Sequence, residues 1–357
     1  MKYDVAIAGA GIAGASLAAE LAPHARVLLL EAEDSAGYHA TGRSAAFWSE
    51  TYGGPDIQPL TTASGPLLKA GGYLDPLGSL HIGRAAETRE IDALLAEFEG
   101  TGVTLAAVDP RETIPGLRPE WTLGVYEPSC EYIDVARLHG DYLAEAKRGG
   151  VDLFLSAGIV SAARDGHWRI ETRAGSFEAE ILVNAAGAWA DPLARACGVA
   201  PLGIEAFRRT MVQLTTDPAP PQGSPHVAHI GGDFYWKPEA GGRLWLSPHD
   251  EIASAPCDSQ PEDIDVAIAI DRFEQVVDWR VEKLEHKWAG LRSFAPDRLP
   301  VYGFDRAEPG FFWCAGQGGF GIQTAPAAAK LAAALLLGRP LDLDVDAARY
   351  SPDRFRP

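Results

Sequence analysis

The sequence predicts an α/β protein built from two domains. The chain has 357 residues, and a domain takes about 150 residues. Hydrophobic residues make up 46% of the chain and charged residues 22%, which is typical of an ordinary globular protein. Residues 5–31 alternate between an apolar run, a glycine-rich turn, a helical pattern and a second apolar run. This alternation favours a fold in which helices cover a parallel sheet.

The first of these apolar runs, Val5–Ala8, is bounded by glycine, as a strand buried on both faces should be. A helical pattern follows to about Leu21, and residues 26–30 then form a second short apolar run. The order strand, glycine turn, helix, strand is that of a Rossmann-like nucleotide-binding unit.

The glycines of the turn have the spacing of a dinucleotide site. Gly9 permits a tight turn, Gly11 lets a pyrophosphate approach the backbone, and Gly14 lets the helix pack closely on the strand. The amino terminus of the helix favours the phosphate charge. Glu31 ends the second strand, about 17 residues after Gly14, where it can bond a ribose hydroxyl. The motif predicts a dinucleotide but does not distinguish NAD from FAD.

Three later segments support the same site. Residues 37–54 alternate small and polar side chains, which favours a loop that turns backbone N–H groups toward a pyrophosphate and opens into a helix near Ser44. A surface loop is the alternative. Residues 181–189 predict a buried strand that turns sharply into a helix. Residues 311–324 predict a strand and a glycine-rich turn, followed by an alanine-rich helix to Leu337.

Four segments, in order along nearly the whole chain, resemble the FAD-dependent amine and amino-acid oxidoreductases related to D-amino acid oxidase, glycine oxidase and sarcosine oxidase. Within them they are most similar to the bacterial D-arginine dehydrogenase branch. The segments are HATGRSAA at 39–46, FYWKP at 234–238, WAGLRSF at 288–294 and GQGGFGIQT at 316–324. The resemblance implies a Rossmann-like FAD-binding domain joined to an α+β substrate domain built on a large antiparallel sheet.

On this basis we assign residues 1–54, 146–200 and 291–357 to the FAD-binding domain, and 55–145 and 201–290 to the substrate domain. The expected cofactor contacts are Gly9, Gly11, Ile12, Ala13, Gly14, Glu31, Ala32, Thr41, Arg43, Ser44, Ala45, Ala46, Gly158, Ile159, Ala186, Gly187, Trp189, Gly290, Arg292, Gly318, Gly319, Phe320, Gly321 and Ile322. The sarcosine oxidase branch attaches its flavin to a cysteine near WAGLRSF. Gly290 falls there, so we expect noncovalent FAD.

The substrate domain should contain helices at 86–98 and 262–283. Residues 208–214 alternate like a strand, and 234–237 with 243–246 predict a hairpin.

Four residues are candidates for binding an amino-acid substrate: Tyr52, Arg209, Tyr235 and Arg292. Arginine matches the two oxygens of a carboxylate, and Arg292 stands in a segment too apolar for ordinary surface; structural pairing is the alternative. Arg208 and Arg209 are neighbours on a strand and should face opposite sides, unless both are solvated. Either tyrosine could donate to a carboxylate or simply be a core aromatic residue. The resemblance implies that Arg292 and Arg209 bind the carboxylate and that both tyrosines line the pocket.

Histidines and two departures from the D-arginine dehydrogenase pattern bear on the substrate. His39 and His81 could titrate near neutral pH, and we expect His39 to support the pyrophosphate loop. The branch has a histidine and a tyrosine where Phe47 and Trp48 stand. It also holds its cationic substrate with an acidic residue, whereas residues 77–84 contain no carboxylate. These differences favour a neutral or apolar substrate side chain.

The resemblance implies hydride transfer from a D-amino acid to FAD, giving an imino acid that water hydrolyses to a 2-oxo acid and ammonia. Trp245 replaces the lysine that the sarcosine oxidase branch uses with dioxygen, so we expect a quinone or an electron-transfer protein as acceptor. One alternative is a glycine- or sarcosine-type oxidase that makes hydrogen peroxide. Another is a 2-hydroxy acid dehydrogenase in which Arg84 supplies a further cation. A third is a flavin-binding protein without turnover.

Charge and cysteine content exclude other classes. The net charge of −18 disfavours nucleic-acid binding. The cysteines at 130, 197, 257 and 314 form no CxxC pair, so we expect reduced thiols in the cytoplasm and no zinc site. No apolar run reaches the length of a transmembrane segment, and no signal peptide is expected because Lys2-Tyr3-Asp4 leads directly into the first strand. We expect a monomer or a homodimer.

Overall fold

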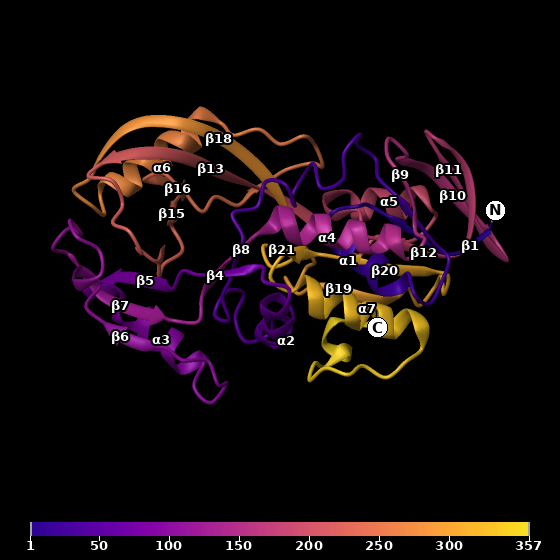
Figure 1. Ribbon diagram of the computed structural model, residues 1–357, viewed down its shortest axis with the longest axis horizontal. Helices are drawn as coiled ribbons and strands as arrows, with labels where there is room; N and C mark the ends of the chain where they lie inside the picture. Colours follow the sequence, from indigo (N-terminus) through magenta and orange to yellow (C-terminus); the bar gives the residue numbers. More distant parts are fainter. Residues whose placement is uncertain (1, 356–357) are drawn as a thin grey trace.

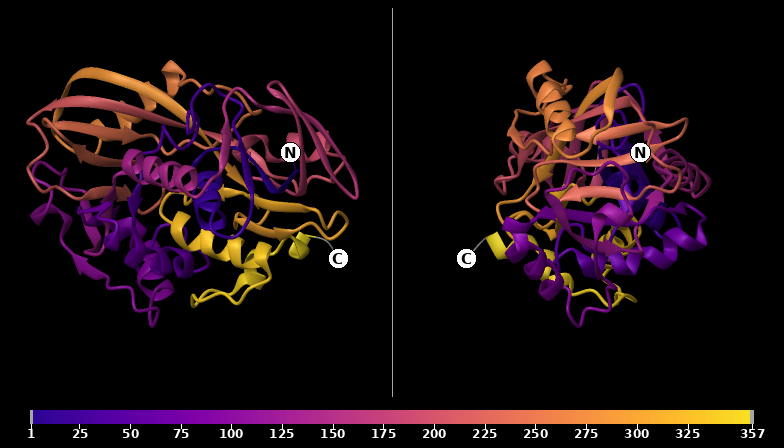
Figure 2. Two further views of the ribbon diagram at one scale, coloured as in Figure 1. Left: turned by 45° about the vertical axis from the view of Figure 1, so that its right-hand side comes forward. Right: turned by 90° about the vertical axis from the view of Figure 1, so that its left-hand side faces the viewer.

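The computed structural model describes residues 2–355 as two large sheets with a small third sheet between them (Figure 1). The eight-stranded sheet lies near the amino terminus, on the right of Figure 1, and the ten-stranded sheet lies on the left. The two parts remain side by side when the molecule is turned by 45° (Figure 2, left). In this described range no helix is both long and apolar enough to span a bilayer.

The eight-stranded sheet has the predicted parallel centre. Its main path runs β10-β11-β12-β1-β2-β9, β1 pairs in parallel with β2 and β12, and β20 continues from β12 in parallel. The strands are β1 (Lys2–Ala8), β2 (Val27–Leu30), β9 (Asp152–Phe154), β10 (Ile159–Asp165), β11 (His167–Thr172), β12 (Gly175–Asn184), β19 (Val301–Phe304) and β20 (Phe311–Ala315). The strand–turn–helix–strand order predicted for the amino terminus is confirmed.

Helices cover both faces of this sheet because its central strands are apolar on both sides. One face packs against α1 (Ile12–Leu21) and α7 (Ala325–Leu337), and α4 (Val135–Arg148) lies against α1. The other face packs against α5 (Ala190–Ala196). The strand before residue 185 and the alanine-rich helix ending at Leu337 were both predicted.

The ten-stranded sheet is mostly antiparallel, and its two longest strands, β13 and β18, pair along their whole length. Its path runs β21-β18-β13-β16-β15-β14-β5-β7-β6, with β17 also paired to β13. The strands are β5 (Ser79–Arg84), β6 (Ala106–Val108), β7 (Trp121–Glu127), β13 (Glu205–Asp217), β14 (His226–His229), β15 (Tyr235–Glu239), β16 (Arg243–Ser247), β17 (Ile252–Ala253), β18 (Arg280–Phe294) and β21 (Gln317–Gly318). The predicted hairpin is formed by β15 and β16.

One face of this sheet packs against α6 (Asp263–Glu274) through an apolar core that includes Trp236 and Phe273. The helix expected over 262–283 is therefore too long, because β18 already begins at Arg280. The chain turns between them: Trp279 is buried, and its indole N–H donates to the Pro115 carbonyl at 2.8 Å. Trp279 therefore anchors a turn between α6 and β18 and does not continue the helix.

The third sheet is formed by β3 (Phe47–Trp48), β4 (Leu74–Pro76) and β8 (Glu131–Ile133), with α2 (Gln58–Ala70) and α3 (Thr88–Glu97) nearby in sequence. The helix expected near Ser44 is wrong. Residues 41–43 form a turn, and Phe47 then pairs with Tyr132 in β8. Pairing with another strand therefore determines the local structure. The helix predicted at 86–98 is confirmed by α3 and the 3-10 turn Ala85–Glu87 before it.

The remaining short helices are 3-10 turns. They are Pro110–Glu112, Gly187–Trp189, Ala347–Tyr350 and Pro352–Phe355.

Candidate cofactor and substrate site

A cavity of about 660 Å³ lies where the carboxyl ends of β1, β2 and β12 approach the ten-stranded sheet. Its walls come from the glycine turn after β1, the loop at 37–45, the turn at 185–189, β18 at 290–293 and the turn at 317–322. In open α/β sheets, ligands bind beyond the carboxyl ends of the strands. The segments that were predicted from the sequence to form the cofactor site therefore line one cavity.

The glycine turn allows a close approach that side chains would block. Gly9 has a φ of +104°, and a Cβ there would lie 2.5 Å from the Ala185 carbonyl oxygen. A Cβ on Gly14 would lie 1.9 Å from the Gly9 carbonyl oxygen. The backbone N–H of Ile12, at the start of α1, donates to Thr41 Oγ1 at 2.9 Å. The turn, the helix and the 37–45 loop therefore form one packed cradle with the shape a pyrophosphate needs.

Glu31 is held at the edge of this cradle. Only 8% of its surface is exposed, and its two carboxylate oxygens accept hydrogen bonds from the backbone N–H groups of Ala10 at 2.8 Å and Glu33 at 3.1 Å. A carboxylate has about four acceptor positions, so Glu31 keeps acceptor capacity on the side that lines the cavity. A ribose hydroxyl would be a suitable donor to it.

Most of the expected cofactor contacts line the cavity. The ones that do are Gly9, Gly11, Ile12, Ala13, Glu31, Ala32, Thr41, Arg43, Ser44, Ala45, Gly158, Ile159, Ala186, Gly187, Trp189, Gly290, Arg292, Gly318, Gly319, Gly321 and Ile322. Gly14, Ala46 and Phe320 are not among the lining residues. Gly14 packs on Gly9, the Ala46 carbonyl accepts from Ile133 N–H at 3.4 Å, and Phe320 packs against Tyr52. These three residues therefore contact other residues of the protein and do not line the cavity.

The sequence missed other lining residues, including Tyr38, Arg173, Met211, Cys257, Ser259 and Gln317. Met211 follows Arg209 by two residues on β13, so strand alternation could have identified it. Cys257 and Ser259 come from an irregular loop that carries no periodic signal.

Arg43 fastens that irregular loop to the cofactor cradle. Its guanidinium donates to the carbonyls of Ser259 at 2.8 Å and Ala289 at 3.1 Å, and it pairs with Asp258. The indole N–H of Trp288 in turn donates to the Arg43 carbonyl at 2.9 Å. Arg43 therefore ties the cradle to both the loop and β18.

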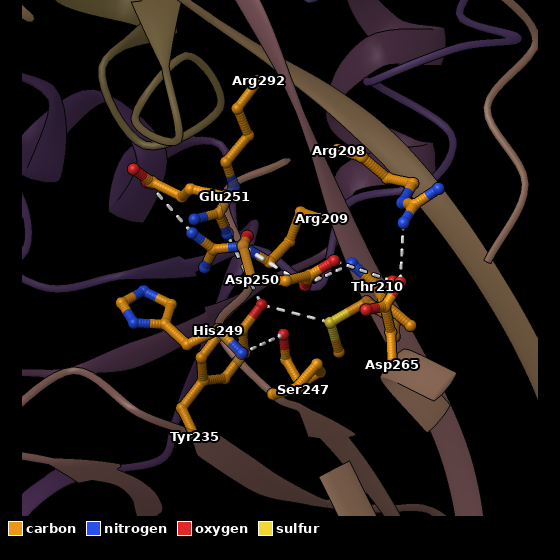
Figure 3. Close-up of polar contacts among 12 residues, drawn as sticks. Arg208, Arg209, Thr210, Tyr235, Ser247, His249, Asp250, Glu251, Asp265 and Arg292 are labelled. Carbon is orange, nitrogen blue, oxygen red and sulfur yellow. Dashed lines mark hydrogen bonds and ion pairs between the residues drawn. The ribbon is translucent and has the colours of Figure 1, made fainter. Parts of the chain in front are cut away.

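Arg208 and Arg209 face opposite sides of β13, as strand alternation predicts (Figure 3). Arg208 pairs with Glu262 and, at 2.7 Å, with Asp265 of α6. Arg209 is only 3% exposed; its Nε donates to the Asp250 carbonyl at 2.7 Å and its Nη2 to Glu251 at 3.1 Å. The alternative that both arginines are solvated is therefore wrong.

Within residues 2–355, Nη1 of Arg209 has no hydrogen-bond partner although it is buried. Burial lowers the pKa of Arg209, and the positive charge of Arg292 lowers it further. Both effects describe a guanidinium whose charge is incompletely compensated by the protein.

Arg292 lies beside Arg209 and lines the cavity. Its Nη2 donates to the Tyr235 hydroxyl at 3.4 Å, and that hydroxyl in turn contacts Met211 Sδ at 3.1 Å. In the part of the chain that the structure describes, Arg292 forms no ion pair with a carboxylate. A half-buried guanidinium without a counter-ion is poorly compensated, and a ligand carboxylate would supply the missing charge.

The Tyr52 side chain also approaches the Arg292 guanidinium. A Cβ on Gly319 would lie 2.2 Å from the Tyr52 hydroxyl and 3.3 Å from Arg292 Cζ. The hydroxyl is therefore close to the guanidinium, although Tyr52 is not one of the residues that line the cavity.

The remaining sequence candidates have other neighbours. His39 lines the cavity, where its Nε2 lies 2.9 Å from Glu33 and its ring packs on Trp189. Arg84 is exposed, pairs with Glu87 and lies over the Trp121 ring. The expectation that Arg84 could supply a further cation to the site is therefore wrong.

Comparison with known proteins agrees with this geometry. The family described as "FAD dependent oxidoreductase" (DAO) matches residues 4–335. Glycine oxidase of Geobacillus kaustophilus is 26% identical over 359 residues, covering 94% of this chain and 93% of that protein. The crystal structure of that enzyme has a TM-score of 0.85 at 23% identity, covering 99% of each chain. L-Proline dehydrogenase of P. horikoshii has a TM-score of 0.86 at 21% identity, covering 99% of this chain and 98% of that one.

The chain spans about half the length of other curated relatives. It covers 56% of hydrogen cyanide synthase subunit HcnC of Pseudomonas aeruginosa, at 25% identity over 64% of this chain. It covers 44% of human mitochondrial dimethylglycine dehydrogenase, at 26% identity over 99% of this chain. The family match extends over most of the sequence, and the glycine cradle fits the cofactor that defines the family. The chain therefore belongs to the DAO family of FAD-dependent oxidoreductases.

Proposed function

We propose that this protein oxidatively deaminates D-amino acids with neutral or apolar side chains to 2-oxo acids, within the D-arginine dehydrogenase branch. One observation carries the proposal: the Arg292 guanidinium faces the cavity, and no carboxylate in residues 2–355 pairs with it. An α-carboxylate has the charge and the two oxygens that such a group binds best. The D configuration rests on the resemblance.

The four polar candidates have complementary roles in this proposal. Arg292 holds the α-carboxylate, and the free Nη1 of Arg209 adds a second positive group. The hydroxyls of Tyr52 and Tyr235 donate to the same carboxylate or border the amino group. Together they fix the α-carbon in the cavity, and such positioning can be worth several kcal/mol.

When bound, FAD supplies the acceptor for two electrons. The substrate amino group can lose its proton to water before binding, so the reaction needs no strong base from the protein. Burial lowers the pKa of His81 to about 4 and that of His249 to about 3, so both imidazoles are weak bases. Water then hydrolyses the imino acid to the 2-oxo acid and ammonia.

We place the electron acceptor among quinones and electron-transfer proteins. None of the residues that line the cavity in the described part of the chain is a lysine. Lys237 is buried elsewhere, between the rings of Tyr132 and Trp245. The alternative is a glycine- or sarcosine-type oxidase, which the similarity to glycine oxidase favours. The 2-hydroxy acid alternative has lost the support of Arg84.

Noncovalent FAD, a cytoplasmic location and a monomer or homodimer complete the proposal. Gly290 lines the cavity where an attachment cysteine would fall, but Cys257 lines it too. Acid precipitation tests the attachment, because noncovalent FAD leaves the protein pellet. The four cysteines are free thiols, as a reducing compartment requires.

Anaerobic flavin absorbance tests the proposed reaction. Purified holoenzyme is mixed with neutral D-amino acids and with their L forms. Rapid bleaching by the D forms alone, followed in air by slow reoxidation with hydrogen peroxide formed only at that slow rate, is the expected result. Rapid peroxide formation would assign the oxidase alternative. Bleaching by sarcosine alone, by hydroxy acids alone or by no compound would contradict the proposal.

A further inference from the structure

The irregular segment 255–261, which connects β17 to α6, lies against the cofactor cradle, and we call it the strap. Within residues 2–355, no hydrogen bond joins the backbone of the strap to another backbone group. Pro256 and Pro261 have no N–H to donate. A segment with so few backbone hydrogen bonds opens at low cost, so its side-chain contacts determine whether it stays in place.

The strap forms part of the cavity wall. Cys257 and Ser259 line the cavity, together with Tyr38 and Arg43 of the loop 37–45. Ser259 is only 4% exposed, although the residues on both sides of it are exposed. The strap lies in sequence between two elements of the substrate domain, whereas the loop 37–45 belongs to the cofactor cradle. A cofactor in this cavity therefore has a segment of the other domain as one of its walls.

Asp258 holds the strap to the cradle. Its carboxylate pairs with Arg43 and accepts a hydrogen bond from the Tyr38 hydroxyl at 3.2 Å. Arg43 also donates to the Ser259 carbonyl at 2.8 Å. We call these three contacts the latch. Asp258 itself does not line the cavity, so a substitution there changes the latch and leaves the groups that face the cofactor in place.

The two sides of the latch differ in how firmly they are held. Arg43 also donates to the Ala289 carbonyl at 3.1 Å, and its own carbonyl accepts from the Trp288 indole at 2.9 Å, so it stays on β18 when the strap moves. The Asp258 side chain is 50% exposed. The hydrogen bond from Arg43 lowers the pKa of Asp258, so the carboxylate is charged at neutral pH. An exposed ion pair is weak and is screened by salt, so the latch can open.

We infer that the strap covers bound FAD and that the latch at Asp258 limits how fast FAD enters and leaves the protein. The inference uses the cofactor of the family and does not depend on the substrate. It rests on one part of the proposed function, noncovalent attachment, because a covalently bound flavin could not leave. The latch joins protein groups only, so it must open for entry and for release alike. It therefore acts on the two rate constants more than on affinity.

Release of FAD from diluted holoenzyme tests the latch. Ultrafiltration at intervals separates free from bound flavin; the time course gives koff, the end point gives Kd, and their ratio gives kon. We expect Asp258→Asn to raise koff and kon together by about three- to tenfold, while Kd changes less than about twofold. Asp263→Asn is the matched control, because it also removes one charge from an exposed ion pair, with Lys287. Its rate constants should equal those of wild type.

Salt provides a second measurement on the same proteins. The Debye length falls from about 10 Å at 0.1 M salt to about 3 Å at 1 M, so salt should weaken the latch of the wild-type protein. Asp258→Asn has no charge left to screen there. The ratio of koff between the variant and wild type should therefore fall toward one at 1 M salt. Salt effects on the cofactor's own phosphates act on both proteins and cancel in this ratio.

Each other outcome would overturn the inference. A rise in koff with an unchanged kon would mean that Asp258 stabilises bound FAD directly. Unchanged rate constants in Asp258→Asn, or a ratio that does not respond to salt, would show that the ion pair holds nothing closed. Flavin that stays in the acid-precipitated pellet would leave no release for the strap to control. If no amino acid bleaches the flavin, the proposed reaction fails, but the release rates still decide the role of the strap.

Discussion

The two faces of the ten-stranded sheet are built by the same strands but treat positive charge differently. Arg208 points to the face that packs against α6 and pairs with two carboxylates, Glu262 and Asp265. Arg208 and Arg209 each pair with a carboxylate and each keep one buried nitrogen without a hydrogen-bond partner. The difference lies in Arg292 on the cavity face, which forms no ion pair within residues 2–355. A stable fold compensates its buried charges, so uncompensated charge marks the face that binds a ligand.

The α6 face is also completely packed. Trp236, Phe273 and Leu246 are 1%, 0% and 0% exposed, and they belong to one apolar cluster. On the cavity face, Arg209, Met211 and Tyr235 line the cavity. The comparison predicts that substitutions on the α6 face change stability, whereas substitutions on the cavity face change ligand binding.

The largest effect is expected from Phe273→Ala. Removing a fully buried aromatic side chain leaves a cavity, and such changes cost about 3–5 kcal/mol of unfolding free energy. Denaturant unfolding measures the loss. Substrate KM should stay within about twofold of wild type, because Phe273 lies on the face away from the cavity. A KM that rises tenfold would show that the two faces are not independent.

Arg292→Ala should weaken substrate binding and leave the stability of the protein nearly unchanged. Losing the partner of a desolvated carboxylate costs about 2–4 kcal/mol, which raises KM or lowers kcat/KM by roughly 30- to 700-fold. The unfolding free energy should fall by less than about 1 kcal/mol, because Arg292 has no counter-ion to abandon. Arg292→Lys keeps the charge but not the planar fork, so it should recover only part of kcat/KM. A strongly destabilised Arg292→Ala variant would contradict the comparison.

One part of the pH dependence of stability should come from His81. Burial lowers the pKa of His81 to about 4, whereas an unfolded histidine has a pKa of about 6.5. Above pH 6.5 both states are neutral and stability is complete. As the pH falls from 6.5 to 4 the unfolded chain takes up the proton first, so about 3 kcal/mol of stability is lost. His81→Phe removes this part of the loss.

Urea unfolding at pH 7, 5.5 and 4.5 measures the difference between wild type and His81→Phe. Burial lowers the pKa of His249 to about 3, so the variant keeps a pH dependence, but with one proton fewer. Parallel pH curves for the two proteins would contradict the prediction.

The sequence predicted what depends on local spacing. The strand and glycine turn at Val5–Gly14 were identified because the glycines stand where a side chain would clash. Gly9, for example, lies against the Ala185 carbonyl. Alternation on β13 separated Arg208 from Arg209. The FAD cofactor needed the resemblance, because the turn alone fits either dinucleotide.

The sequence could not predict contacts that depend on tertiary pairing. Glu127 lies opposite Ser79 only after β5 and β7 pair, so its contact with Thr51 has no signature in sequence. The helix expected near Ser44 was wrong because Phe47 pairs with β8.

The smallest of these effects is expected from Arg208→Gln. The Asp265 side chain is 7% exposed, and burial raises its pKa. Without Arg208, Asp265 must bury its charge unpaired or take up a proton, which should cost about 1–2 kcal/mol at pH 7. Arg208→Gln combined with Asp265→Asn should recover part of the loss, since the unpaired charge is gone. Substrate KM should not change in either variant, because Arg208 points away from the cavity. A tenfold rise in KM would mean that charge on the α6 face also serves the ligand.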